Sequence, residues 1–207
     1  MAISVTWRRV IIFLVSCVPL ALLIWGIFQQ NLGGDPAKYI VLNTGLWSLR
    51  FLLITLALTP LVRYFKWRWV MVHRRMLGLF ALFYGVLHLF SYYQFILGGN
   101  LDMLASEIVR RPYILVGAPA LLILIVLGIT STRGWMKRLG KRWQSLHQLV
   151  YLGLILAWIH LYWQVRSSYF EAVLYGIFGG LLLAARVPKW WSNWQRRKSK
   201  SKRACIR

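Results

Sequence analysis

Three of the four histidines lie in or at the edge of long apolar segments, where imidazole is uncommon. His88 lies in LFYGVLHLFSYY, and His147 and His160 lie near the two ends of LHQLVYLGLILAWIH. A histidine in a membrane-embedded segment is by default a functional candidate, and neutral imidazole is the usual protein ligand of haem iron. The 13 residues between His147 and His160 correspond to about 20 Å along a helix. This spacing indicates redox centres at two depths of a membrane.

The elements that position these histidines are expected to be membrane helices. Hydrophobic residues make up 59% of the 207-residue chain, charged residues only 14%, and the mean hydropathy is +0.58. These values exclude an ordinary soluble domain. Six apolar stretches of about 18–22 residues are each long enough to cross a bilayer as a helix, and the second and sixth are the weakest. The predicted fold is an all-α integral membrane protein, a six-transmembrane-helix bundle, with spans at 10–28, 43–62, 76–97, 113–130, 146–164 and 169–187.

Charged residues orient this bundle. With the N-terminus in the cytoplasm, most of the 26 Lys and Arg residues fall on cytoplasmic loops, the bias that sets membrane orientation. All four acidic residues fall on the opposite side. The sequence therefore predicts a multi-pass protein with both termini in the cytoplasm, a strongly basic inner face and a nearly neutral outer face. The inner cations are Arg8, Arg9, Arg63, Lys66, Arg68, Arg74, Arg75, Arg133, Lys137, Arg138, Lys141, Arg142 and those from Arg186 onward, and the outer acids are Asp35, Asp102, Glu107 and Glu171.

The net charge of +22 does not indicate a nucleic-acid-binding protein. The charges follow the loops rather than forming one patch, and anionic membrane lipid is the natural partner of such segments. Cys17 in a span and Cys205 in the tail form no CxxC pattern, so neither a disulfide framework nor iron–sulfur ligation is expected. We divide the chain into a membrane domain, residues 1–187, and a basic cytoplasmic tail, residues 188–207.

Distances in sequence from the flanking cations give each histidine a depth. His88 and His160 both lie toward the outer side, so we predict that they are the two axial ligands of one iron between the third and fifth helices. His147 lies close to the inner surface. His73 has the right depth to be its partner, but its position among loop cations is typical of a solvated histidine. It is retained only as an alternative fourth ligand.

Two further interpretations of the histidines stay open. On a straight helix, 13 residues leave an angular offset of roughly 140°, so His147 and His160 require either a bend or different partners. The competing structural interpretation is that these histidines form hydrogen bonds between helices. Zinc is disfavoured because no Asp or Glu within the spans completes a tetrahedral site.

A series of short motifs runs along the membrane part of the chain. The longest is LGKRWQSLHQLVY at 139–151, and the others are GGDP at 33–36, TG-W at 44–47, TPL at 59–61, RRMLGL at 74–79, LH at 87–88 and RPY at 111–113. In this order and spacing they resemble the MsrQ family, the haem-binding membrane subunits of bacterial MsrPQ methionine sulfoxide reductase systems. The likeness extends from the first helix to about residue 187. The wider relatives are the ferric-reductase-like transmembrane domains.

The resemblance implies b-type haem held by His88, His147 and His160 as the iron (metal) ligands, and FMN as a second cofactor. It implies that electrons come from the quinone pool or a cytoplasmic flavin reductase. They pass to MsrP, a periplasmic molybdopterin enzyme that reduces methionine sulfoxide in envelope proteins. The chain would then be an electron-transfer subunit in the bacterial inner membrane, with no catalytic residues of its own. His73 is not part of the family pattern.

Three functions therefore compete at this stage. The first is the electron conduit to a periplasmic reductase, and the second is a stand-alone ferric reductase or oxidase-like haem protein. The third is a haem-free membrane scaffold or small transporter, which the lack of intramembrane carboxylates disfavours for proton coupling. No GxGxxG motif occurs, so the chain is not expected to oxidise a nicotinamide by itself.

Overall fold

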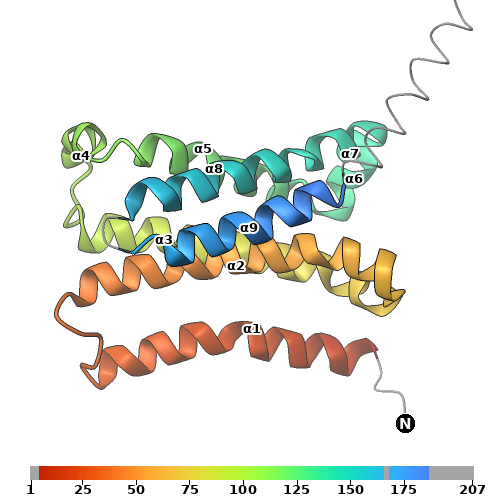
Figure 1. Ribbon diagram of the computed structural model, residues 1–207, viewed down its shortest axis with the longest axis horizontal. Coiled ribbons are helices and arrows are strands. Elements are labelled where there is room, and N and C mark those ends of the chain that lie inside the picture. Colours follow the sequence, from red (N-terminus) through yellow and green to blue (C-terminus); the bar gives the residue numbers. More distant parts are fainter. Residues whose placement is uncertain (1–4, 166–167, 187–207) are drawn as a thin grey trace, which may run out of the picture.

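The computed structural model describes residues 5–165 and 168–186, and most of these residues are helical (Figure 1). Six long helices are α1 (Val5–Phe28), α2 (Pro36–Phe65), α3 (Arg74–Phe95), α5 (Ile114–Ile129), α8 (Leu149–Gln164) and α9 (Phe170–Ala184). Shorter elements join them: η1 (Arg68–His73), η2 (Leu101–Met103), α4 (Leu104–Arg110), α6 (Arg133–Leu139) and α7 (Lys141–His147). The proposed tail, residues 188–207, lies outside the described residues.

The all-helical prediction is confirmed, whereas the count of six spans is only partly supported. Four helical segments of the described chain are long and apolar enough to cross a bilayer: α1, α2, η1 with α3, and α7 with α8. A fifth is obtained if α5 is joined to the segment before it, although the two are bent by 120°. The α9 helix has 15 residues and is shorter than a full span. The second predicted span, expected to be weak, is in fact the longest helix, with 30 residues.

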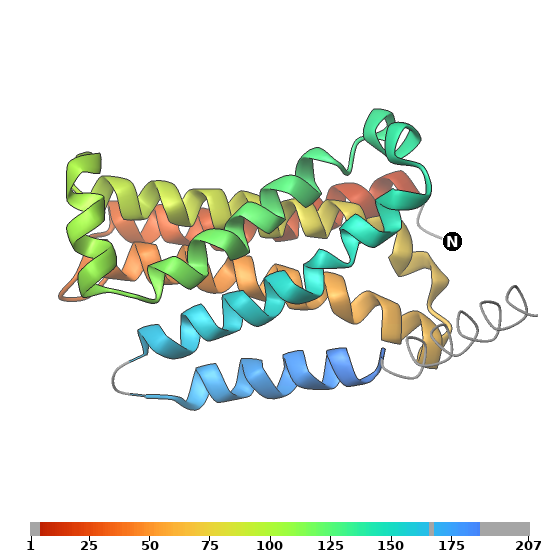
Figure 2. The same cartoon turned by 90° about the horizontal axis from the view of Figure 1, so that it is seen from above.

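The helices pack as two antiparallel pairs with two additional helices. The α2 helix packs along α3, α5 packs along α8, and α3 also contacts α5, so the pairs meet through these two helices. The α9 helix contacts α8 and α2, and α1 lies along the outside of α2 and α3 (Figures 1 and 2). This arrangement brings α3, which carries His88, close to α8, which carries His160.

Local sequence sets the ends of the longest helix. Pro36 occupies the first turn of α2, where its missing N–H is not needed, and the Asp35 carboxylate accepts a hydrogen bond from the Lys38 backbone N–H at 3.0 Å. At the other end Lys66 adopts a left-handed conformation with φ of 59° and terminates the helix. Thus α2 is long because both of its ends are capped outside the apolar stretch.

The core lies between α2 and α3 and is rich in aromatic side chains. Phe51 stacks on Tyr84 with ring centroids 5.3 Å apart, and Tyr84 is 1% exposed. The Tyr84 hydroxyl accepts from the Leu20 N–H at 3.2 Å and donates to the Ser16 carbonyl at 2.9 Å. These two backbone groups would normally pair with each other, so Tyr84 is inserted into the hydrogen-bond ladder of α1, next to Pro19. This insertion attaches α1 to α3.

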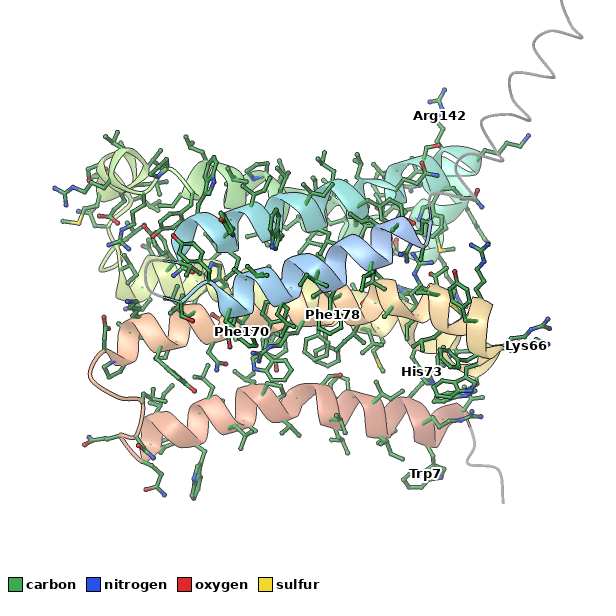
Figure 3. The ribbon with its side chains drawn as sticks, in the orientation of Figure 1. Trp7, Lys66, His73, Arg142, Phe170 and Phe178 are labelled. Atoms are coloured by element: carbon green, nitrogen blue, oxygen red, sulfur yellow. The ribbon has the colours of Figure 1, made fainter. Side chains whose placement is uncertain are left out.

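The charged side chains are segregated to the two ends of the bundle. Lys66, His73 and Arg142 lie at one end, which we call the basic end (Figure 3). The acidic end carries the α1–α2 loop, η2, α4 and the start of α9, and these hold all four acidic residues. The predicted separation of charge along the helix axes is therefore present in the fold.

One cation, Arg50, lies within a predicted span. Its Nε donates to the Tyr175 hydroxyl at 2.7 Å, and its guanidinium lies 4.8 Å from the centre of the Trp47 ring. An aromatic face and a hydroxyl stabilise a guanidinium that has no acidic side chain nearby, since all four acids lie at one end. Arg50 thus links α2 to α9.

Candidate functional site

The structure brings His88 and His160 together in the interior. Their ring centroids are 6.1 Å apart and the ring planes are nearly perpendicular, at 82°. The two residues are 72 positions apart in sequence and come from different helix pairs. The predicted pairing of these two histidines by depth therefore agrees with their contact in the fold.

Each of these imidazoles makes the same kind of hydrogen bond. His88 Nδ1 lies 2.8 Å from the Val41 carbonyl oxygen on α2, and His160 Nδ1 lies 2.8 Å from the Tyr113 carbonyl oxygen at the start of α5. A carbonyl only accepts, so Nδ1 must carry the proton in both rings. Each ring then has an unprotonated Nε2, the form that binds a metal, with its orientation fixed by the backbone.

This pair fits the axial ligands of a haem iron. Two imidazole nitrogens that bind one metal from opposite sides are about 4 Å apart, since each bond is about 2 Å. Their ring centroids are then about 6 Å apart, which matches the observed 6.1 Å. Among the described residues, no three His, Cys, Asp or Glu side chains converge as a metal site. The donor set is therefore two imidazoles, which suits a macrocycle that itself supplies the remaining ligands.

His147 lies apart from this pair, at the basic end. It is the last residue of α7, its ring stacks on Trp143 with centroids 4.0 Å apart, and its Nε2 is 3.2 Å from Thr130 Oγ1. The Thr130 hydroxyl donates its proton to the Val126 carbonyl at 2.7 Å. His147 Nε2 must then be the donor to Thr130, which leaves Nδ1 unprotonated. This is the opposite tautomer from that of His88 and His160.

The angular problem between His147 and His160 has a structural answer. Gln148 interrupts the helix between α7 and α8, and its N–H bonds to the Ser145 carbonyl, three residues back. The two histidines have different partners, at opposite ends of α5: Thr130 for His147 and Tyr113 for His160. The structure therefore shows both a break in the helix and different hydrogen-bond partners for the two histidines.

The prediction that His73 is solvated is wrong. His73 is 2% exposed, its ring makes an edge contact with Trp69 at 6.3 Å, and its Nδ1 has no hydrogen-bond partner among the described residues. His73, at the end of the 3-10 turn η1, lies between the end of α2 and the start of α1 at the basic end, so a residue assigned to a loop becomes buried (Figure 3). Its ring contacts Trp69 rather than His147, the partner that its depth in the sequence suggested.

At the acidic end, one of the four acidic side chains is buried and paired within the protein. Glu107 is 9% exposed, accepts a hydrogen bond from the Tyr92 hydroxyl at 3.1 Å and forms an ion pair with Arg111 at 2.8 Å. A hollow of about 530 Å³ opens close to this cluster. It is lined by Arg110, Pro112, Tyr113, Tyr162, Trp163, Val165 and Tyr169. Tyr113 thus contributes its carbonyl to His160 and its side chain to a surface recess.

Sequence reasoning missed the groups that hold the imidazoles. Backbone carbonyls have no sequence signature. An internal similarity of the chain could nevertheless have pointed to these two histidine sites. A glycine and a histidine are repeated at an interval of 72 residues, as Gly45 and His88 and again as Gly117 and His160. In both cases the histidine lies 47 residues after the residue whose carbonyl accepts its hydrogen bond, which is Val41 or Tyr113.

Known proteins were compared with the chain. Residues 44–158 match the family model described as ferric reductase like transmembrane component. A protein of Xanthomonas euvesicatoria pv. vesicatoria named protein-methionine-sulfoxide reductase heme-binding subunit MsrQ is 42% identical over 207 residues, 97% of this chain and 94% of the relative. A Salmonella paratyphi B protein of the same name is 42% identical over 192 residues, 91% of this chain and 96% of the relative. No solved structure matches.

The matched segment contains His88 and His147, all of α3 and α5 and most of α2 and α8, and it ends two residues before His160. These matches define a ferric-reductase-like transmembrane protein. Within that class, the chain belongs to the MsrQ family.

Proposed function

We propose that this chain is a haem-binding, electron-carrying membrane subunit in which His88 and His160 are the axial ligands of one b-type haem iron. The observation that carries the proposal is the contact between the two imidazoles, whose ring centroids are 6.1 Å apart and whose Nδ1–H groups are each bonded to a backbone carbonyl. The relatives are named heme-binding subunits, which supports the same cofactor here.

The chain's own groups prepare both ligands for this role. The carbonyls of Val41 and Tyr113 hold the proton on Nδ1 and orient the rings, and such bonds raise the basicity of the ligating nitrogen. No acidic side chain lies near the middle of the bundle, since all four acids lie at one end. Bound haem would supply a one-electron iron couple at this point.

The direction of transfer follows from the two ends. We place the basic end in the cytoplasm of a bacterial inner membrane, with both chain termini there, because Lys and Arg favour cytoplasmic loops. Electrons would enter from the quinone pool or a cytoplasmic flavin reductase. They would leave at the acidic end to a periplasmic MsrP-like molybdopterin subunit that reduces methionine sulfoxide. His160 is four residues from the end of α8, and Tyr113 connects it to the surface recess.

We also retain His147 as a proposed cofactor ligand at the basic end. Its position at the junction of α7 and α8 suits an entry point for electrons. Because its Nε2 is bonded to Thr130, ligation through that atom requires this hydrogen bond to break.

FMN, which the family resemblance implies, would need cationic or backbone donors for its phosphate. The inner loop Arg138–Arg142 provides cations. Arg138 lies over the Trp135 ring at 5.5 Å, and Arg142 projects away from the bundle (Figure 3). A phosphate site there would be open to solvent, and these same charges also suit anionic lipid.

The experiment that tests the function uses reduced protein in oriented vesicles, with orientation checked by proteolysis of the basic tail. Addition of a soluble molybdopterin methionine sulfoxide reductase with its substrate on the acidic side should reoxidise the haem Soret band. Reoxidation only from the basic side would overturn the assigned direction. Reoxidation by ferric chelates but not by the reductase would favour the stand-alone ferric reductase, and absence of a Soret band would favour the haem-free scaffold.

A further inference from the structure

A glycine lies against each of the two central imidazoles. A Cβ added to Gly45 would be 2.9 Å from His88 Nδ1, and one added to Gly117 would be 2.5 Å from His160 Nδ1. Real Cβ atoms essentially never approach another heavy atom this closely. In both cases the three nearest atoms all belong to the imidazole ring. No side chain larger than hydrogen fits at these two positions while the rings stay where they are.

The glycine and the accepting carbonyl belong to the same helical turn. Tyr113 is four residues before Gly117, and its carbonyl accepts both the Gly117 N–H at 3.0 Å and His160 Nδ1 at 2.8 Å. Val41 is likewise four residues before Gly45. Each ring therefore approaches one turn of the neighbouring helix closely enough for Nδ1 to reach a helix carbonyl beside the glycine. The missing side chain is what permits this approach.

Other glycines in the bundle have different neighbours. An added Cβ at Gly153 would meet Ile123, and one at Gly78 would meet only a Thr55 methyl group at an ordinary 3.6 Å. Small residues commonly allow membrane helices to pack closely, and these positions fit that general role. Gly176 is the nearest parallel, because an added Cβ there would be 2.7 Å from Trp158 Nε1, which donates to the Ala172 carbonyl four residues earlier. Gly45 and Gly117 differ from Gly176 because the ring that they admit is an imidazole, which keeps a second nitrogen free for a metal.

We propose that Gly45 and Gly117 are positioning residues that seat the axial imidazoles of His88 and His160 and thereby fix their Nδ1–H tautomer. This inference rests on the proposed haem ligation. A Cβ at either position would push Nδ1 away from the carbonyl, so the ring would lose both its orientation and the hydrogen bond that increases its basicity. A weaker nitrogen donor stabilises ferric iron less, so the reduction potential of the site should rise.

The first test compares Gly117→Ala and Gly45→Ala with Gly78→Ala as the matched control. We expect about 10–100-fold weaker haem retention in Gly117→Ala and Gly45→Ala, the usual effect of losing a group that orients a metal ligand. The loss should be larger for Gly117→Ala, where the contact is shorter. Any haem that remains should show a raised midpoint potential and altered low-spin electron paramagnetic resonance g-values. Full retention with unchanged potential and g-values would overturn the proposal.

A second test separates seating of the ring from folding. In His160→Gly, haem binding should be lost. It should return when free imidazole is added, because the space beside Gly117 that the His160 ring normally occupies is still open. In the double variant His160→Gly/Gly117→Ala, the new methyl group occupies that space. We therefore expect restoration of haem binding to need at least about tenfold more imidazole than in His160→Gly. If Gly117→Ala alone misfolds, the double variant should fold, because the clashing ring is gone.

The outcomes distinguish the two proposals. Retention of haem by His160→Gly without imidazole would contradict the ligand assignment and therefore the proposed function. Equal rescue by imidazole in the single and double variants would contradict only the role of Gly117. Misfolding of both Gly117→Ala and the double variant would likewise show that Gly117 serves packing, not the ring.

Discussion

The central histidines and the basic-end histidines occupy different environments. His88 and His160 each donate through Nδ1 to a helix carbonyl and approach each other to 6.1 Å. His147 donates through Nε2 to a threonine, and His73 has a buried Nδ1 without a described partner. Burial alone therefore does not distinguish the four histidines. His88 and His160 differ from the other two because each donates to a backbone carbonyl and their rings contact each other.

The largest effect should come from the central pair. His88→Ala and His160→Ala should each abolish most bound haem, because each would remove one of the two proposed ligands of the same iron. The measurement is the haem-to-protein ratio of purified protein, with Asp102→Asn, at an exposed position, prepared in parallel as the control for handling. An unchanged haem-to-protein ratio in either variant would contradict the proposed ligation by that histidine.

A smaller loss is expected at the basic end. His147→Ala should remove only part of the haem and leave the central low-spin spectrum, since the His88–His160 pair does not contact it. Reduced-minus-oxidised spectra with haem quantification would measure this. If His147→Ala lost as much haem as His160→Ala, the basic end would be as essential as the central pair.

His73→Ala should leave the haem spectrum intact but lower thermal stability. The ring is 2% exposed, so its removal leaves a cavity, and large-to-small substitutions at buried sites commonly cost about 2–5 kcal/mol. The orphan Nδ1 offsets part of this cost, because an unpaired buried polar atom is itself unfavourable. Thermal unfolding followed by size-exclusion chromatography would measure the loss of stability, and a loss of haem before unfolding would instead support ligation by His73.

The smallest effect should follow from Glu107→Gln. This change removes the charge that pairs with Arg111 while keeping an acceptor for the Tyr92 hydroxyl. We expect a loss of about 1–3 kcal/mol in stability and an unchanged haem ratio, since the cluster does not contact His88 or His160. Asp102→Asn, at an exposed position, serves as the control. A changed haem spectrum in Glu107→Gln would connect this end of the bundle to the central site.

The sequence by itself determined the features that depend on local composition. Apolar length requires helices in a membrane, loop cations separate the two ends, and the depths of His88 and His160 follow from residue rise along a helix. The recurrence of Gly45 and His88 at Gly117 and His160 was also present in the sequence, although its meaning was not visible without the partners.

Only the tertiary structure decided which atoms meet. Whether an imidazole reaches a carbonyl 47 residues away depends on how closely two helices approach, and that distance is set by side chains from both. The same holds for the buried state of His73, the internal use of Glu107 and the opposite tautomer of His147. Helical periodicity is a property of neighbouring residues, whereas tautomer and burial are fixed by residues that are distant in sequence and adjacent only in the folded chain.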